Sequence, residues 1–196
     1  MISKPTIKYE ISDGCIAIIT LSRPDVADAI NSQMALELNN IFSTLPNNIR
    51  VAILTGEGEK AFCAGADLKE RSKMNVSSWQ VQHQQFRHAL QSIMTCQIPI
   101  IAAVNGAAYG GGLELALGCD FIYATKTANF ALPEATLGIM PGTCGTQNLP
   151  RAIGIRHAKE LLLTGKSFSA EEGYYLGMIN KICEPESLMD DVLACA

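Results

Sequence analysis

The segment Ile100–Leu117, IIAAVNGAAYGGGLELAL, carries the features that decide the fold. Its first five residues are apolar, and we expect Ile100–Val104 to form a buried strand. Three consecutive glycines, Gly110–Gly112, follow, and Leu113–Leu117 is predicted to be a helix that Gly118 ends. A strand that leads through a glycine turn into a helix is typical of α/β proteins.

The same alternation of strands and helices extends in both directions from this segment. Further strands are predicted at Ile7–Glu10, Cys15–Leu21, Val51–Thr55, Phe121–Ala124, Asn129–Leu132 and Ile179–Cys183. Further helices are predicted at Ser32–Leu45, Val76–Met94, Ile155–Leu163, Ala170–Leu176 and Leu188–Cys195. We therefore expect one α/β domain over residues 1–196, with sheets covered on both faces.

Two helix starts carry capping signals. Ser32 is predicted to cap the helix that runs to about Leu45, because its side chain can accept a hydrogen bond from the first turn. Asp67 is predicted to cap another helix, with Glu70 three residues on as its capping-box partner.

Composition excludes several classes of protein. The chain has 196 residues, 48% of them hydrophobic and 17% charged, so wholesale disorder is not expected. Its net charge of −4 disfavours nucleic acid as a partner. The seven cysteines are scattered and form no metal-ligand or disulfide pattern, which favours a reduced cytoplasm. Neither a signal peptide nor an apolar run near the roughly 20 residues of a membrane span is expected.

Three segments have unusual local requirements. Ala61–Asp67 places small residues before a helix start, where backbone N–H groups lack partners. Gly110–Glu114 joins a costly glycine run to a glutamate in the first helical turn. Leu132–Gly142 holds Glu134 in an apolar neighbourhood that would raise the pKa of its carboxyl. Judged singly, each glutamate is more simply a surface residue.

Taken jointly, the motifs resemble the crotonase superfamily and its enoyl-CoA hydratases. The matching stretches are Ala61–Arg71 (AFCAGADLKER), Gly110–Leu117 (GGGLELAL), Cys119-Asp120, Pro133-Glu134, Pro141-Gly142, Gly145–Gln147 and Leu149–Arg151. They span nearly the whole chain, and AFCAGADLKER and GGGLELAL resemble the branch that includes methylglutaconyl-CoA hydratase and AU-rich-RNA-binding relatives. The resemblance implies a stacked β-β-α spiral core, with two roughly perpendicular sheets surrounded by helices.

The resemblance also implies a reaction and a site. It predicts hydration of a trans-2-enoyl-CoA, of short or branched acyl chain, in fatty-acid or branched amino-acid breakdown. The backbone N–H groups of Ala66 and Gly111 would form an oxyanion hole for the thioester oxygen. Glu114 would deprotonate the water, and Glu134 would exchange the proton at the α-carbon. Further residues of the substrate and water site would be Ala64, Asp67, Leu68, Gly110, Pro133 and Gly142.

The family implies no metal and no cofactor beyond the coenzyme A of the substrate, and assembly as homotrimers or hexamers. Three positions depart from its pattern: Asp28, near the expected CoA-binding face, Cys144, where glycine is usual, and Asn148. The family's C-terminal helical segment is expected to be absent from these residues.

Other readings stay open. Double-bond isomerisation could use the same scaffold, although retention of both glutamates favours hydration. An RNA-binding relative is disfavoured because Ser32–Leu45 contains no lysine. A degenerate, inactive relative is a further alternative, given Cys144.

Overall fold

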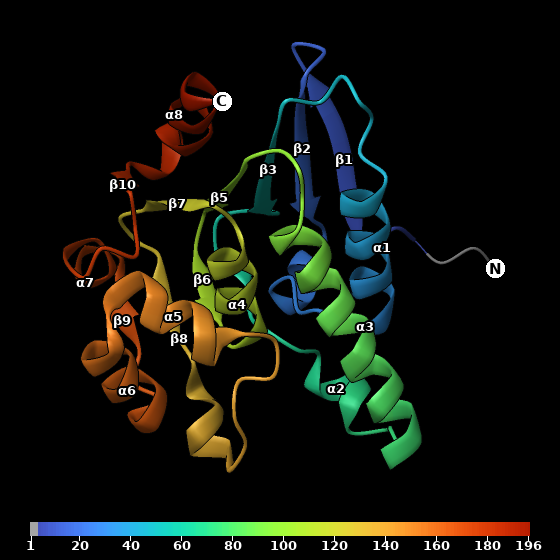
Figure 1. The fold of residues 1–196 in the computed structure, drawn as a ribbon, viewed down its shortest axis with the longest axis vertical. Helices are drawn as coiled ribbons and strands as arrows, with labels where there is room; N and C mark the ends of the chain where they lie inside the picture. Colours follow the sequence, from blue (N-terminus) through green and yellow to red (C-terminus); the bar gives the residue numbers. More distant parts are fainter. Residues whose placement is uncertain (1–3) are drawn as a thin grey trace.

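The protein is described by a computed structural model that covers residues 4–196 (Figure 1). Two sheets form its centre. The first has six strands in the order β1 (Ile7–Ser12), β2 (Ile16–Leu21), β3 (Val51–Gly56), β5 (Ile100–Val104), β7 (Phe121–Thr125) and β10 (Lys181–Cys183). The second has four strands in the order β4 (Ala61–Cys63), β6 (Ala107–Tyr109), β8 (Asn129–Ala131) and β9 (Phe168–Ser169).

The chain winds between the two sheets in repeated steps. Each step places one strand in the first sheet, the next strand in the second, and then a helical segment, as in β3–β4, β5–β6 and β7–β8. All pairings among β2, β3, β5, β7 and β10 are parallel, whereas β1–β2 and β8–β9 are antiparallel. This arrangement confirms the predicted β-β-α spiral.

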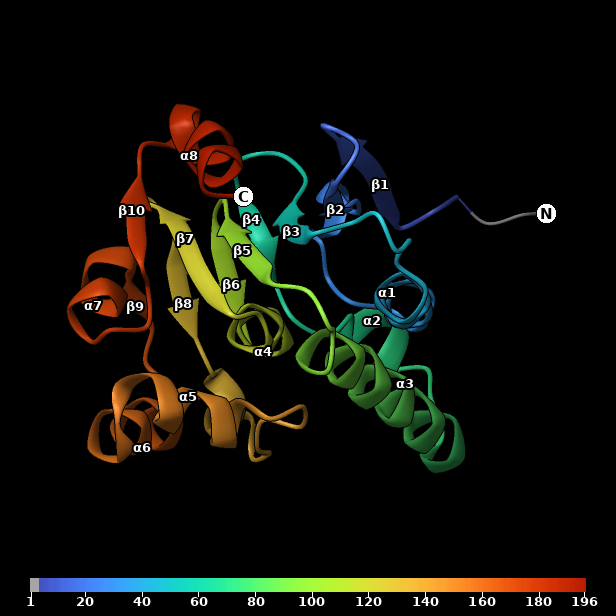
Figure 2. The ribbon, with the colours of Figure 1, turned by 45° about the horizontal axis from the view of Figure 1, so that its top comes forward.

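Helices surround the sheets (Figure 2). The α-helices are α1 (Ser32–Ser43), α2 (Leu68–Arg71), α3 (Val76–Met94), α4 (Gly111–Gly118), α5 (Gly145–Ile153), α6 (Ile155–Thr164), α7 (Ala170–Tyr175) and α8 (Leu188–Cys195). Short 3-10 helices are η1 (Pro24–Val26), η2 (Pro133–Leu137) and η3 (Pro185–Ser187). Helices α1 and α3 lie side by side on one flank, and the main core fills the space between them and the sheets.

Burial explains why the central strands could be predicted from their continuous apolar sequence. Every residue of β3 and of β5 is buried, as expected for strands covered on both faces. Ile53 and Leu54 on β3 are among the largest fully buried side chains. Burying such a side chain contributes about 1.5–3 kcal/mol, so these strands hold the spiral together.

Of the two predicted caps, the one on α1 is wrong and the one on α2 is confirmed without its capping box. Asn31, not Ser32, caps α1, and its side chain accepts a hydrogen bond from the Met34 N–H at 2.9 Å. Asp67 caps α2 as expected, accepting from the Glu70 N–H at 3.0 Å. The Glu70 carboxylate does not close a capping box, because it accepts instead from Ser32 and Gln82 on neighbouring helices.

Candidate active site

Glu114 lies in the first turn of α4 and is only 3% exposed. One carboxylate oxygen accepts from the Thr143 N–H at 2.8 Å and from the Gly145 N–H at 2.7 Å. The other accepts from the Thr143 hydroxyl at 2.5 Å. Three donors, two from Thr143 in the loop before α5 and one from the first residue of α5, therefore hold this carboxyl in one orientation, which a surface glutamate would not need.

Glu134 lies in η2 and is also buried, at 8% exposure. Its Oε2 is the one buried side-chain polar atom without a hydrogen-bond partner among residues 4–196. Burial raises the pKa of its carboxyl, and the charge of Glu114 adds to that rise. The predicted rise in pKa is confirmed, and a buried group that lacks a partner is suited to exchange a proton with a ligand.

The glycine turn brings the two glutamates to one place. Gly110 has φ +51°, a backbone conformation that favours glycine, and a β-carbon there would lie 3.0 Å from Glu134 Oε1. A β-carbon at Gly145 would likewise lie 3.0 Å from Glu114 Oε1. Bare backbone at these two positions leaves room for both carboxyls beside the start of α4.

Two free N–H groups lie beside this turn. Gly111 is the first residue of α4, so its N–H has no acceptor within the helix. A β-carbon at Gly111 would lie 3.9 Å from the Ala66 nitrogen, which places the two backbone segments next to each other. The backbone groups on either side of Ala66 are already hydrogen-bonded. The Ile30 N–H donates to Gly65 O at 2.7 Å, and the Asp67 N–H donates to Ile30 O at 2.8 Å. The Ala66 N–H itself donates no backbone hydrogen bond among the described residues.

The other predicted site residues are distributed around this centre. Pro133 begins η2 directly before Glu134. Ala64 is exposed, and its N–H bonds to Ala27 O at 2.9 Å. Leu68 is 65% exposed on α2. Gly142 is exposed next to Thr143, and a β-carbon there would lie 3.0 Å from His83 Cε1.

Thr143 and His83 lie close to the predicted site residues but were not among them. Thr143 supplies two of the three hydrogen bonds to Glu114, and only its position after Pro141-Gly142 hints at this. His83 stacks on Trp79 with ring centroids 5.3 Å apart, and its ring packs against Gly142. Burial, then the charges of Arg71 and Arg87, lower the pKa of His83. No pattern around His83 signalled this position.

Cys144 stands in a left-handed backbone conformation, at φ +83°. A non-glycine residue there costs about 1–2 kcal/mol, part of which the lower flexibility of the unfolded chain offsets. We expect Cys144→Gly to raise the free energy of unfolding by up to about 1 kcal/mol. Urea denaturation measures this. The matched control is Cys144→Ala, which keeps the strain; equal stabilisation by both variants would contradict the explanation.

Asp28 is fully buried, and its position near the CoA-binding face stays a prediction. Its carboxylate accepts from the Arg23 N–H at 2.5 Å and from the Glu57 N–H at 3.0 Å. Burial outweighs these bonds and raises the pKa of Asp28 to about 6. The carboxylate therefore ties a turn to the residue that follows β3.

This raised pKa has a consequence for stability. Below the ordinary value of 3.8 the carboxyl is neutral in both states, but between pH 4 and 7 ionisation favours the unfolded chain. We expect the wild type to lose about 2–3 kcal/mol relative to Asp28→Asn over this range. Urea denaturation at several pH values measures the difference, and parallel pH profiles would refute it.

The fold and this site define the class of protein. A β-β-α spiral in which a glycine turn gathers two buried carboxyls and unpaired backbone N–H groups is the arrangement of the crotonase superfamily. The family model for enoyl-CoA hydratase/isomerase matches residues 11–196. The chain belongs to the enoyl-CoA hydratase/isomerase family.

Individual relatives agree with this assignment. A solved structure of an enoyl-CoA hydratase from Bacillus anthracis is 40% identical and superimposes with a TM-score of 0.95, covering 97% of this chain and 74% of that one. A short-chain-enoyl-CoA hydratase of Clostridium acetobutylicum is 39% identical over 91% of this chain and 69% of its own length. A crotonyl-CoA hydratase of Syntrophomonas wolfei is 37% identical over 90% of this chain and 69% of its length. The narrower likeness to methylglutaconyl-CoA hydratases stays a prediction.

Within residues 4–196, no helix has both the length and the apolar character needed to cross a lipid bilayer. The same residues contain no group of three or more His, Cys, Asp or Glu side chains that could hold a metal ion.

Proposed function

We propose that this chain is a hydro-lyase that adds water across the 2,3 double bond of a trans-2-enoyl-CoA with a short or branched acyl chain. The observation that carries the proposal is the contrast between the two buried glutamates. Glu114 is held by three donors, whereas Glu134 has an unpartnered oxygen and a raised pKa.

The thioester oxygen binds between the N–H groups of Ala66 and Gly111. Water addition places negative charge on this oxygen as the double bond is converted into an enolate-like state. Fixed donors that meet this charge lower the barrier, because they need no reorganisation during the reaction. Loss of one such donor costs about 2.7–4 kcal/mol in a well-characterised hydrolase.

The two carboxyls divide the proton transfers. Glu114, fixed by Thr143 and Gly145, orients the water and takes one of its protons as the oxygen bonds to C3. Glu134, whose raised pKa keeps its proton available, delivers a proton to the α-carbon C2. The product is a 3-hydroxyacyl-CoA, and proton exchange with solvent restores both carboxyls.

Both the relatives and the site support hydration over isomerisation. Several relatives are named as hydratases, and 37–40% identity covers nearly the whole chain. Moving a double bond needs one group to shuttle a proton, whereas hydration benefits from a second carboxyl that holds water. Glu114 and Glu134 are both present and buried.

Loss of the conjugated thioester absorbance tests the proposal. We expect purified protein to hydrate crotonyl-CoA and to release 3-hydroxybutyryl-CoA, identified by chromatography. Incubation with a 3-enoyl-CoA in parallel detects isomerase activity. No turnover of any short or branched 2-enoyl-CoA, with turnover of the 3-enoyl substrate, would replace hydration by isomerisation.

Assembly, location and cofactor use belong to the same proposal. We propose a homotrimer or a pair of trimers in the cytoplasm, with acyl-CoA as substrate and no resident cofactor, as the family resemblance implies. Light scattering on the purified protein should then give a mass of three or six chains of 21.1 kDa. A single-chain mass at micromolar concentration would refute the assembly.

A further inference from the structure

Ala66 lies in an extended segment whose backbone is hydrogen-bonded to the loop of residues 27–30. The Ala64 N–H donates to Ala27 O at 2.9 Å, the Ile30 N–H donates to Gly65 O at 2.7 Å, and the Asp67 N–H donates to Ile30 O at 2.8 Å. These bonds flank Ala66 and fix the direction of its own N–H, which stays free for a ligand.

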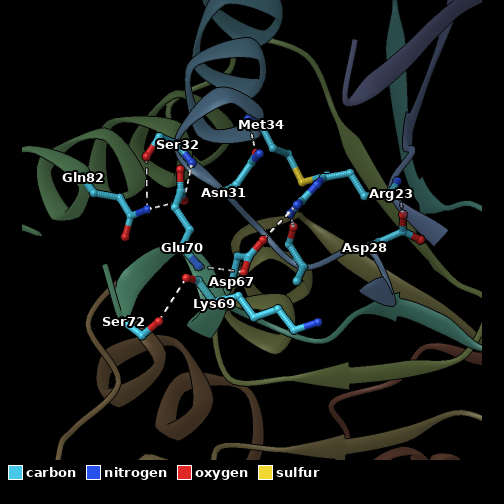
Figure 3. Close-up of polar contacts among 11 residues, drawn as sticks. Arg23, Asp28, Asn31, Ser32, Met34, Asp67, Lys69, Glu70, Ser72 and Gln82 are labelled. Atoms are coloured by element: carbon cyan, nitrogen blue, oxygen red, sulfur yellow. Dashed lines mark hydrogen bonds and ion pairs between the residues drawn. The ribbon is translucent and has the colours of Figure 1, made fainter. Parts of the chain in front are cut away.

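The Arg23 side chain is bonded both to this loop, at Ala29, and to Asp67, the residue after Ala66. Its Nη2 lies 2.8 Å from Asp67 Oδ2, and its Nη1 donates to Ala29 O at 2.5 Å (Figure 3). The two side chains of the ion pair are only 20% and 12% exposed. Pairs shielded from water to this degree are screened less than surface pairs. The other Asp67 oxygen accepts from the Glu70 N–H, so this carboxylate is bonded on both oxygens.

The charges of this pair matter for the proposed reaction. Asp67 directly follows the Ala66 donor, and an uncompensated carboxylate there would repel negative charge that develops on the thioester oxygen. Burial acts to raise the pKa of Asp67, but the hydrogen bonds from Arg23 and from the Glu70 N–H outweigh it and lower the pKa. Asp67 is therefore ionised at neutral pH and needs the guanidinium.

We propose that Arg23 is a positioning residue for hydration: through Asp67 it fixes the Ala66 N–H and cancels the carboxylate charge beside the thioester oxygen. This inference rests on the proposed function. Arg23 acts through Asp67 and is not assigned a contact with substrate.

Arg23→Gln leaves the Asp67 charge uncompensated. We expect kcat for crotonyl-CoA to fall about 10- to 100-fold with less than a threefold change in KM, because the repulsion grows only as the transition state forms. Adding Asp67→Asn removes that charge and keeps the helix cap, since asparagine caps helices as well as aspartate. The double variant should regain about tenfold in kcat relative to Arg23→Gln.

A merely structural ion pair would give the opposite pattern, in which the second substitution leaves kcat unchanged or lowers it further. That result, or unchanged kcat in Arg23→Gln, overturns the proposal. The matched control is Lys166→Gln, which removes an exposed ion pair with Glu160 on α6 and should leave kcat unchanged.

Two further measurements keep the test decisive. Wild-type turnover of crotonyl-CoA is measured first, since its absence would refute the proposed function and this inference together, whereas normal wild-type activity isolates the role of Arg23. If Arg23→Gln does not fold, Arg23→Lys takes its place: the charge is kept, one of the two bonds is lost, and kcat should stay within about fivefold. A larger loss in that variant, or a double variant that folds without activity, also overturns the proposal.

Discussion

Glu134→Gln is expected to lower kcat by about 10²- to 10⁴-fold, the range that general acid–base groups contribute. Glutamine has nearly the same shape but cannot deliver a proton to the α-carbon. The free energy of unfolding at neutral pH should not fall, because the folded protein already disfavours the ionised form of Glu134. Crotonyl-CoA hydration and urea denaturation on one preparation separate these two effects.

Glu114→Gln provides a matched comparison. A glutamine oxygen can still accept from the Thr143 and Gly145 N–H groups, and its amide can donate to the Thr143 hydroxyl. The variant should fold, and its kcat should drop as well, because an amide does not deprotonate water. Glu171→Gln, on the exposed side of α7, should leave activity unchanged. Full activity in either buried variant would refute the acid/base pair.

Gly112→Ala is expected to lower the free energy of unfolding by about 3 kcal/mol or more, at the upper end of overpacking effects. A β-carbon at this position would overlap the carbonyl oxygen of Cys63 and lie 2.8 Å from Cys63 Cβ. These atoms belong to β4 and cannot move aside without separating α4 from the second sheet. Urea denaturation measures the loss, which can extend to a protein that does not fold.

Gly111→Ala, one residue earlier, should behave in the opposite way. Its β-carbon would meet Ile30 Cδ1 at 3.4 Å, an ordinary contact, so stability should be retained or slightly increased. The methyl group would lie 3.9 Å from the Ala66 nitrogen and crowd the thioester oxygen, which should reduce kcat/KM at least about 100-fold. A stable Gly111→Ala with full activity would show that the oxyanion does not bind between Ala66 and Gly111.

Long elements with clear periodicity were predictable from sequence. The predicted bounds of α3 and α8 agree with the structure, and those of α1, β3, β5 and β7 agree within two residues. The short strands β4, β6 and β9 were not predicted as strands. Their two or three residues contain no periodicity, and each pairs with a strand that is distant in the sequence. Helix α5 (Gly145–Ile153) was not predicted, and it contains Pro150, a residue that disfavours a helix interior.

By itself, the sequence determined the family, the alternation of strands and helices, and two glutamates in unusual settings. These are properties of neighbours along the chain: apolar runs, glycine positions and ordered motifs. Tertiary structure alone decided that Glu114 is held by Thr143 and Gly145, that Glu134 keeps an unpartnered oxygen, and that Arg23 pairs with Asp67. Thr143 and Gly145 are 29 and 31 residues from Glu114 in the sequence, and Arg23 is 44 residues from Asp67. Only the packed spiral brings these groups within hydrogen-bond distance in a site shielded from water.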